Sequence, residues 1–169
     1  PKLATLGHLL ARNRRRYGAH VVHLGIVLIA AGITGSSAYQ SEVQVALAPG
    51  ETVSHKGYTL VYREDLRQSL PGKQRYQAIL SVQRDEREID TLRPEKNFHL
   101  DVEQWVSEVD VRATLAEDLY VSLASATQDG LATFQILVNP LVNLIWIGGG
   151  VLVLGTLLGL WPAKRGRRE

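Results

Sequence analysis

Residues 17–39 read YGAHVVHLGIVLIAAGITGSSAY, residues 139–162 read NPLVNLIWIGGGVLVLGTLLGLWP, and neither stretch contains Asp, Glu, Lys or Arg. A helix needs about 20 predominantly apolar residues to cross the hydrocarbon core of a bilayer, which is about 30 Å thick. Tyr17 and Tyr39 end the first stretch, and tyrosine is favoured at both membrane interfaces. Both stretches are therefore predicted to be transmembrane helices.

The charged residues divide around these two helices. Residues 42–129 hold 16 of the 17 acidic residues but only 10 of the 19 basic residues. The other basic residues crowd the outer ends of the helices, as in the runs 12–16 and 164–168. Because Lys and Arg beside a span tend to stay in the cytoplasm, we expect both ends to be cytoplasmic and the acidic domain to lie outside. The net charge of +2 is thus no sign of nucleic-acid binding.

The region between the helices alternates polar and apolar residues, which is the period of a β-strand. Asp129-Gly130 is typical of a hairpin turn between the last two strands, and Arg84–Glu88 is expected to be a turn. The region predicts a small antiparallel barrel or sandwich of about six or seven strands. The clearest strand patterns cover residues 42–47, 58–62, 76–82, 109–115, 119–123 and 133–138.

The first helix carries two specialised faces. At about 100° per residue, Gly18, Gly25 and Gly32 form one stripe, which lets a neighbouring helix come close. His20 and His23 fall on the other side. Their face is completed by the mostly small residues Val27, Ala30, Ala31 and Thr34.

An ionisable side chain within a span usually faces protein, water or a cofactor. His23 lies deeper than His20, and a neutral imidazole can ligate haem iron. His23 is therefore the candidate metal or haem ligand, and His20 is a weaker one. Two other interpretations stay open: either ring hydrogen-bonds another helix, or His20 lies among the lipid head groups.

No other residues in this chain indicate a catalytic or metal-binding site. His8, His55 and His99 are expected to be surface or half-buried residues. The sequence has no Cys, which excludes disulfides and thiolate sites, and it shows no phosphate loop, nucleophile elbow or metal-spaced cluster. We therefore predict no catalytic residue, and we do not expect the segment to be catalytic on its own.

Six stretches of the chain form a recognisable series: RRYGAHVVHLGIVLIAAGITGSSAY (15–39), PGETV (49–53), GYTLVY (57–62), PEKNF (94–98), TLAEDLYVSL (114–123) and NPLVNLIWIGGGVLVLGTLLGLWP (139–162). Taken in this order, they resemble the C-terminal part of the cytochrome c maturation protein F family (CcmF). Members of that family are the haem lyase subunits of cytochrome c-type biogenesis.

The resemblance implies a role in attaching haem to apocytochrome c at the inner membrane, with a haem chaperone and other maturation subunits as partners. In that family, two transmembrane histidines are thought to hold a haem b that reduces the incoming haem. His23 matches one of these axial ligands, so the second is expected outside this segment. The family's tryptophan-rich haem-handling motif is also absent here.

The chain is thus predicted to have a cytoplasmic connector or interfacial helix (1–16), two transmembrane helices (17–39 and 139–162), a periplasmic β domain (40–138) and a cytoplasmic basic tail (163–169). Asn139 and Pro140 suit the N-cap and first turn of the second helix. Because the chain starts at Pro1 rather than Met, we expect a segment of a longer protein. The alternatives to a haem lyase segment are a non-catalytic, membrane-tethered scaffold and a small-ligand sensor fragment.

Overall fold

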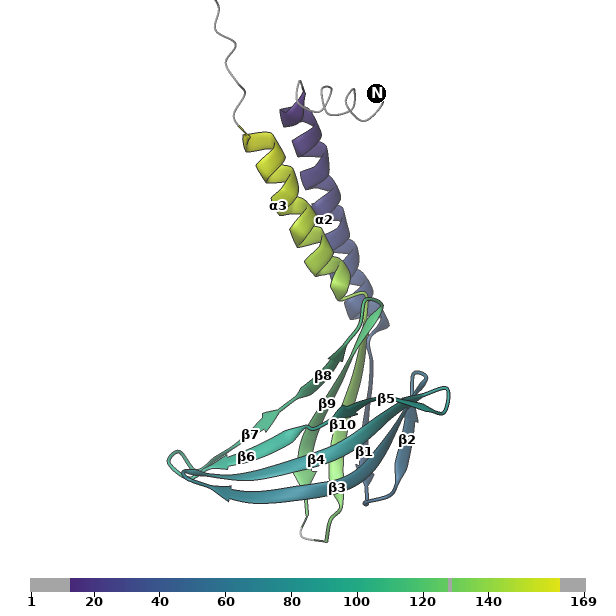
Figure 1. The fold of residues 1–169 in the computed structure, drawn as a ribbon, viewed down its shortest axis with the longest axis vertical. Helices are drawn as coiled ribbons and strands as arrows, with labels where there is room; N and C mark the ends of the chain where they lie inside the picture. The colour runs from purple at the N-terminus through teal and green to yellow at the C-terminus, as the bar shows by residue number, and fades with distance from the viewer. Residues whose placement is uncertain (1–12, 128, 162–169) are drawn as a thin grey trace, which may run out of the picture. The chain divides into compact units, whose positions relative to one another are not determined.

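The computed structural model describes residues 13–127 and 129–161, which form two helices and ten strands (Figure 1). They divide into two compact units. One unit contains both helices, and the other is the β domain, Tyr39–Pro140. Most of the expected connector, including His8, and the whole basic tail lie outside the described residues.

The two helices are α2 (Arg14–Tyr39) and α3 (Asn143–Leu160). Each is long and apolar enough to cross a membrane, and most of its surface is exposed within the structure. A soluble protein would bury such helices in its core, whereas helices facing lipid keep their apolar side chains outward. The helices therefore agree with the predicted membrane association.

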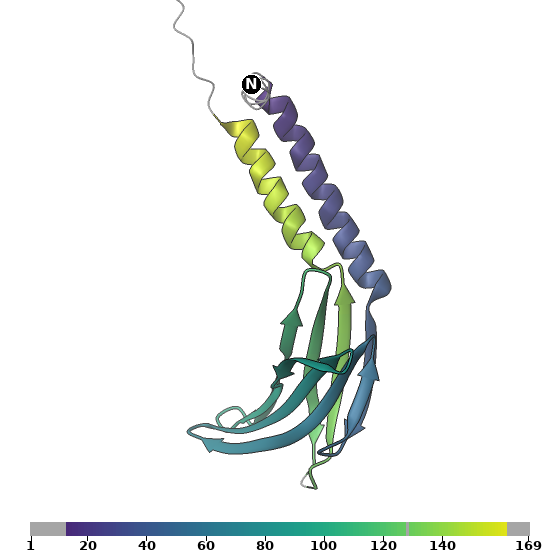
Figure 2. The ribbon, with the colours of Figure 1, turned by 45° about the vertical axis from the view of Figure 1, so that its right-hand side comes forward.

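Glycines bring α2 and α3 into backbone contact, as the glycine stripe of the first helix predicted. Gly18, Gly25 and Gly32 are buried. An added Cβ would lie 2.7 Å from the Gly159 nitrogen at Gly18, and 2.7 Å from the Gly148 oxygen at Gly25. The helices run antiparallel side by side, since low-numbered residues of α2 meet high-numbered residues of α3 (Figure 2). The predicted glycine stripe is confirmed.

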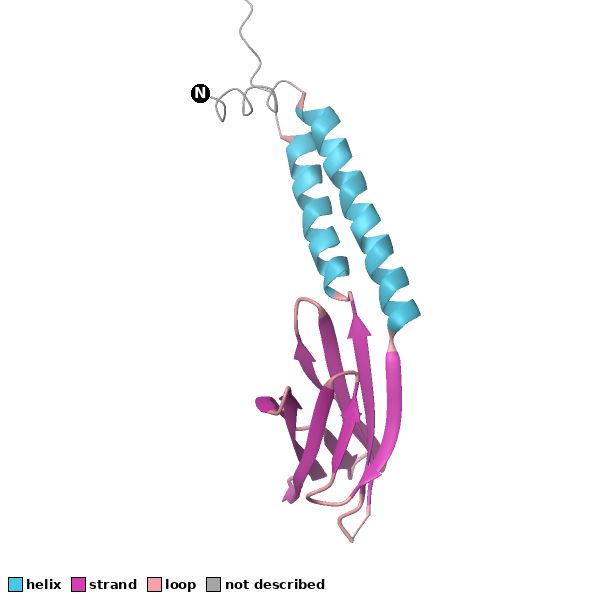
Figure 3. Cartoon of the chain, turned by 90° about the vertical axis from the view of Figure 1, so that its right-hand side faces the viewer, coloured by secondary structure: helices cyan, strands magenta, loops and turns pink. Residues whose placement is uncertain are grey.

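The β domain is a sandwich of two antiparallel sheets, drawn in magenta in Figure 3. The four-stranded sheet consists, in spatial order, of β1 (Ser41–Leu47), β10 (Ala132–Pro140), β9 (Glu117–Ala126) and β8 (Asp110–Ala113). The six-stranded sheet consists of β2 (Thr52–His55), β3 (Tyr58–Leu70), β4 (Lys73–Arg84), β6 (Glu95–His99) and β7 (Gln104–Glu108), with β5 (Arg87–Leu92) paired to β4.

The core lies between the two sheets, where alternating side chains of both point inward. Leu60, Leu80 and Val82 from the six-stranded sheet are fully buried, as are Phe134 and Ile136 from the other sheet. The rings of Tyr62 and Phe134 meet edge to face across the core, with centroids 5.0 Å apart. The predicted fold class, two apolar helices flanking an antiparallel β domain, is confirmed.

The prediction of six or seven strands was too low. It missed β2, β5, β6 and β7, and it did not extend β3 and β4 to their full lengths. All five residues of β7 are exposed, as are the first four of β5, so no buried face produces a clear alternation there. The expected turn at Arg84–Glu88 is shorter: Asp85 and Glu86 alone form it.

The start of the second helix also differs from the expectation. Asn139 and Pro140 belong to β10, and α3 begins at Asn143 with no side-chain cap from Val142. Strand β1 starts opposite Val138, so Pro140 pairs only with β9. A proline is tolerated at such a place because the missing N–H faces the open side of the strand.

Candidate functional site

His23 lies on α2 with its ring fixed by its own helix. Its Nδ1 is 2.7 Å from the carbonyl oxygen of Ala19, one turn earlier. A carbonyl oxygen can only accept a hydrogen bond, so Nδ1 carries the proton and donates it. In the neutral ring, the lone pair of Nε2 is then free, which is the arrangement found in metal-binding histidines.

The face that holds His23 is not covered by α3. His20, His23 and the residues that share their face are exposed, whereas the glycines on the opposite side are buried against α3. None of the described residues bonds to Nε2 of His23. Because an imidazole within an apolar span needs a partner, this partner is expected from a group outside the described residues.

His55 and His99 lie on two different strands of the six-stranded sheet. Nε2 of His55 donates to the carbonyl oxygen of Ser41 across 3.2 Å, so this ring links β2 to β1. His99 ends β6 opposite Gln104 of β7. Across residues 13–127 and 129–161, no three His, Cys, Asp or Glu side chains come together as a metal site. Among the described histidines, His55 is bonded to a main-chain carbonyl, whereas Nε2 of His23 has no partner within the described residues, so we keep the helix face of His23 as the candidate ligand position.

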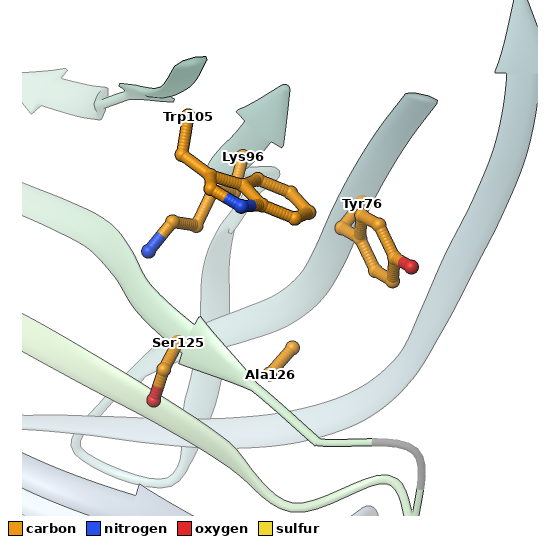
Figure 4. Close-up of a pocket in the computed structure, with 5 residues that line it drawn as sticks. All are labelled: Tyr76, Lys96, Trp105, Ser125 and Ala126. Carbon is orange, nitrogen blue, oxygen red and sulfur yellow. The ribbon is translucent and has the colours of Figure 1, made fainter. Parts of the chain in front are cut away.

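A cleft of about 380 Å³ opens between the two sheets at the end of the sandwich (Figure 4). Its walls are Tyr76, Lys96 and Trp105 on one side and Ser125 and Ala126 of β9 on the other. The ring of Trp105 lies 5.5 Å from that of Tyr76. Sequence reasoning missed this site because β4, β6 and β7 supply one residue each, and only their pairing brings the residues together.

Two cations frame this cleft. Lys96 donates to the carbonyl oxygen of Ala124, and its Nζ lies 5.9 Å from the Trp105 ring centroid. Arg67 stacks over Tyr76 at 5.3 Å and donates to the carbonyl oxygen of Thr127 at 2.7 Å. Each cation therefore contacts an aromatic ring of the six-stranded sheet and a main-chain carbonyl at the end of β9 or just beyond it.

A cluster of three polar residues, apart from the cleft, joins the two sheets. The Tyr58 hydroxyl donates to Glu117 across 2.9 Å, and Arg84 approaches the same carboxylate at 3.1 Å. Burial raises the pKa of Tyr58, and the hydrogen bond to Glu117 adds to this rise. Tyr58 and Arg84 come from the six-stranded sheet and Glu117 from the other, so the cluster stabilises the sandwich.

These features define a class of protein: a β sandwich inserted in the sequence between two helices that are long and apolar enough to cross a membrane, the first of which exposes a histidine side chain. The family model described as "CcmF C-terminal beta-sandwich" matches residues 38–140. The chain belongs to the CcmF family, and the resemblance seen in the sequence is confirmed.

Relatives and a solved structure agree with this assignment. The chain is 32% identical over 146 residues to the cytochrome c-type biogenesis protein CcmF of Pseudomonas aeruginosa, covering 86% of this chain and 22% of the relative. It is 31% identical over 163 residues to the probable cytochrome c-type biogenesis protein NrfE of Escherichia coli, covering 95% of this chain and 29% of the relative. A solved "Cytochrome c Heme Lyase CcmF" shares the fold, with a TM-score of 0.74 at 24% identity over 90% of this chain and 26% of that one. The chain thus spans less than a third of the length of these proteins.

Proposed function

We propose that this chain is part of a membrane haem lyase for cytochrome c maturation. In this proposal, α2 supplies His23 as one axial ligand to a haem b within the membrane, and the β domain meets a haem chaperone or apocytochrome c on the periplasmic side. Membership of the CcmF family supports the general role. The arrangement around His23 supports the ligand assignment.

One observation carries the ligand assignment: Nδ1 of His23 donates to Ala19, and Nε2 is left with an exposed lone pair on an apolar helix. A ring that only stabilised α2 would gain little from this exposure, because an imidazole in lipid is costly without a partner. The bond to Ala19 fixes the tautomer and orients the ring, as partners of metal-bound histidines do.

The residues around His23 fit a flat, bulky ligand. Ala30, Ala31 and Thr34 are exposed on the same face and add little bulk beyond the ring. When bound, a haem b held by two histidines would supply one-electron redox chemistry. His23 would provide one of those ligands, and His20 is a weaker candidate on the same face. The other ligand would come from another helix of the full-length protein.

A spectrum of the full-length protein tests this assignment. We expect His23→Ala to abolish the low-spin absorption of a bis-histidine haem, because one axial bond is lost. The matched control is His20→Ala, one turn away on the same face, which is expected to keep the low-spin signal. An unchanged spectrum in His23→Ala would remove the ligand role and favour the tethered scaffold.

A further inference from the structure

The six-stranded sheet extends beyond the sheet that covers it. Ala78, Leu80 and Val82 of β4 point into the core and are buried. Tyr76 continues this inward alternation but is only partly buried, and Trp105 is 51% exposed. Figure 1 shows the β3–β4 hairpin with β6 and β7 reaching past β9 and β10. Core-facing aromatic residues thus line the cleft at the open end, where the end of β9 covers them only in part.

These residues form a continuous surface because the strands place them side by side. Tyr76 is opposite Lys96, and Phe98 is opposite Trp105. The Trp105 ring lies 5.0 Å from Phe98 and 5.5 Å from Tyr76. We call the five residues Arg67, Tyr76, Lys96, Phe98 and Trp105 the aromatic shelf.

The aromatic shelf carries one uncompensated positive charge. Arg67 is paired with Asp65 at 2.8 Å. Lys96 is half-buried and donates to Ala124, but no carboxylate of the described residues forms an ion pair with it. A lysine has three N–H donors, so the ammonium can still donate to a ligand. A half-buried ammonium beside aromatic rings suits a carboxylate next to an apolar group.

The shelf adjoins an unpaired strand edge. Strand β7 ends the order of the six-stranded sheet, all five of its residues are exposed, and within the described residues no strand pairs with its outer side. An extended peptide can add to such an edge through main-chain hydrogen bonds, while alternate side chains enter neighbouring pockets. Trp105 and Ser107 point inward from β7, so the same alternation directs peptide side chains toward the cleft.

We propose that the aromatic shelf and β7 bind an extended peptide segment of a partner protein in which an acidic residue lies two positions from an apolar or aromatic residue, so that both side chains point to the same face. The peptide pairs with β7, its apolar side chain packs on Tyr76 and Trp105 in the cleft of about 380 Å³, and its carboxylate accepts from Lys96. This inference rests on the partner-contact half of the proposed function and is separate from haem ligation by His23.

Fluorescence anisotropy with defined peptides tests the proposal. The probe is a labelled, end-blocked hexapeptide of valine and threonine that carries one phenylalanine and, two residues away on the same face of the extended peptide, one glutamate. A second peptide is identical except that glutamine replaces the glutamate. The protein is the full chain in discs of zwitterionic lipid. We expect the glutamate peptide to bind about tenfold more tightly, because a hydrogen bond to a charged group is the stronger one.

Variants locate the binding surface. Lys96→Met is expected to weaken the glutamate peptide about tenfold and leave the glutamine peptide unchanged. Trp105→Ala should weaken both peptides about tenfold, because it removes the apolar contact. The matched control is Lys73→Met, which lies on the outer face of β4 near the same hairpin and should change neither affinity.

Three outcomes would overturn the proposal: equal affinity of the two peptides, equal loss in Lys96→Met and Lys73→Met, or no binding of either peptide at millimolar concentration. The comparison of the two peptides on the unchanged protein does not depend on any variant folding. His23→Ala should bind both peptides normally, so failure of haem ligation and failure of peptide binding are distinguishable.

Discussion

His23 and Lys96 show how single residues acquire a specific chemistry from their surroundings. The carbonyl of Ala19 assigns the proton of His23 to Nδ1 and leaves Nε2 available. The carbonyl of Ala124 and the ring of Trp105 hold the Lys96 ammonium between the sheets. In both cases a main-chain oxygen orients the side chain, as the partners of metal-bound histidines do.

Tyr62 makes the stability of the β domain depend on alkaline pH. Burial raises the pKa of Tyr62 to about 12 from 10.0, and the charge of Asp65 adds to the rise. Above pH 10 the unfolded chain therefore loses its proton before the folded one, so stability is lost as the pH rises through about 12. The free energy of unfolding lost in this way is on the order of 3 kcal/mol.

Tyr62→Phe removes this alkaline loss of stability, because phenylalanine has no proton to lose. We expect urea unfolding of the variant, followed by circular dichroism, to show a smaller loss of stability between pH 10 and 12 than the unchanged chain, with similar stability at pH 7. Part of the loss persists, because burial also raises the pKa of Tyr58. Identical pH profiles for the two proteins would contradict this assignment.

At the scale of elements, α2 and α3 are held together by close backbone contact rather than by large side chains. Such contact provides dispersion attraction where the hydrophobic effect between helices is absent. The three consecutive glycines of α3 are not equivalent in this respect. Only Gly148 meets α2, whereas an added Cβ at Gly149 or Gly150 meets nothing within 4 Å.

Two alanine substitutions separate packing from helix propensity. Gly25→Ala places a Cβ 2.7 Å from the Gly148 oxygen and the Leu152 nitrogen, so the helices must move apart. Gly149→Ala gains about 1 kcal/mol of helix propensity and creates no clash. In detergent, we expect Gly25→Ala to lower the thermal unfolding midpoint and Gly149→Ala to keep or raise it. Equal midpoints would show that the contact contributes nothing.

At the scale of the whole molecule, the division of charge predicts which side of the membrane each part faces. The chain has no cysteine, so a single introduced thiol reports its own location. Asp101 of the β domain and Asn13 before α2 are both exposed positions. Asp101→Cys and Asn13→Cys therefore form a matched pair with one thiol on each expected side.

A membrane-impermeant maleimide reads out this topology in intact spheroplasts. We expect Asp101→Cys to react at once and Asn13→Cys to react only after the membrane is permeabilised, because the arginines next to Asn13 retain that end in the cytoplasm. The reverse labelling pattern would place the β domain in the cytoplasm and would remove its proposed contact with periplasmic partners.

The sequence by itself determined the helices, the β character of the domain between them, the glycine stripe and the position of His23. These features depend on local composition and on periods of 3.6 and 2 residues, which any single segment displays. It misplaced the start of α3, because Asn139-Pro140 suits both a helix cap and the end of a strand with one open side.

Only the tertiary structure decided which strands pair and which residues of different strands become neighbours. The extent of β3 and β4, the strands β5, β6 and β7, and the aromatic shelf depend on pairings between distant segments, and those pairings leave no period in the sequence where both faces of a strand are exposed. Tyr76, Lys96 and Trp105 carry no motif. They become neighbours because β4, β6 and β7 pair in one register, and the end of β9 in the second sheet covers them only in part.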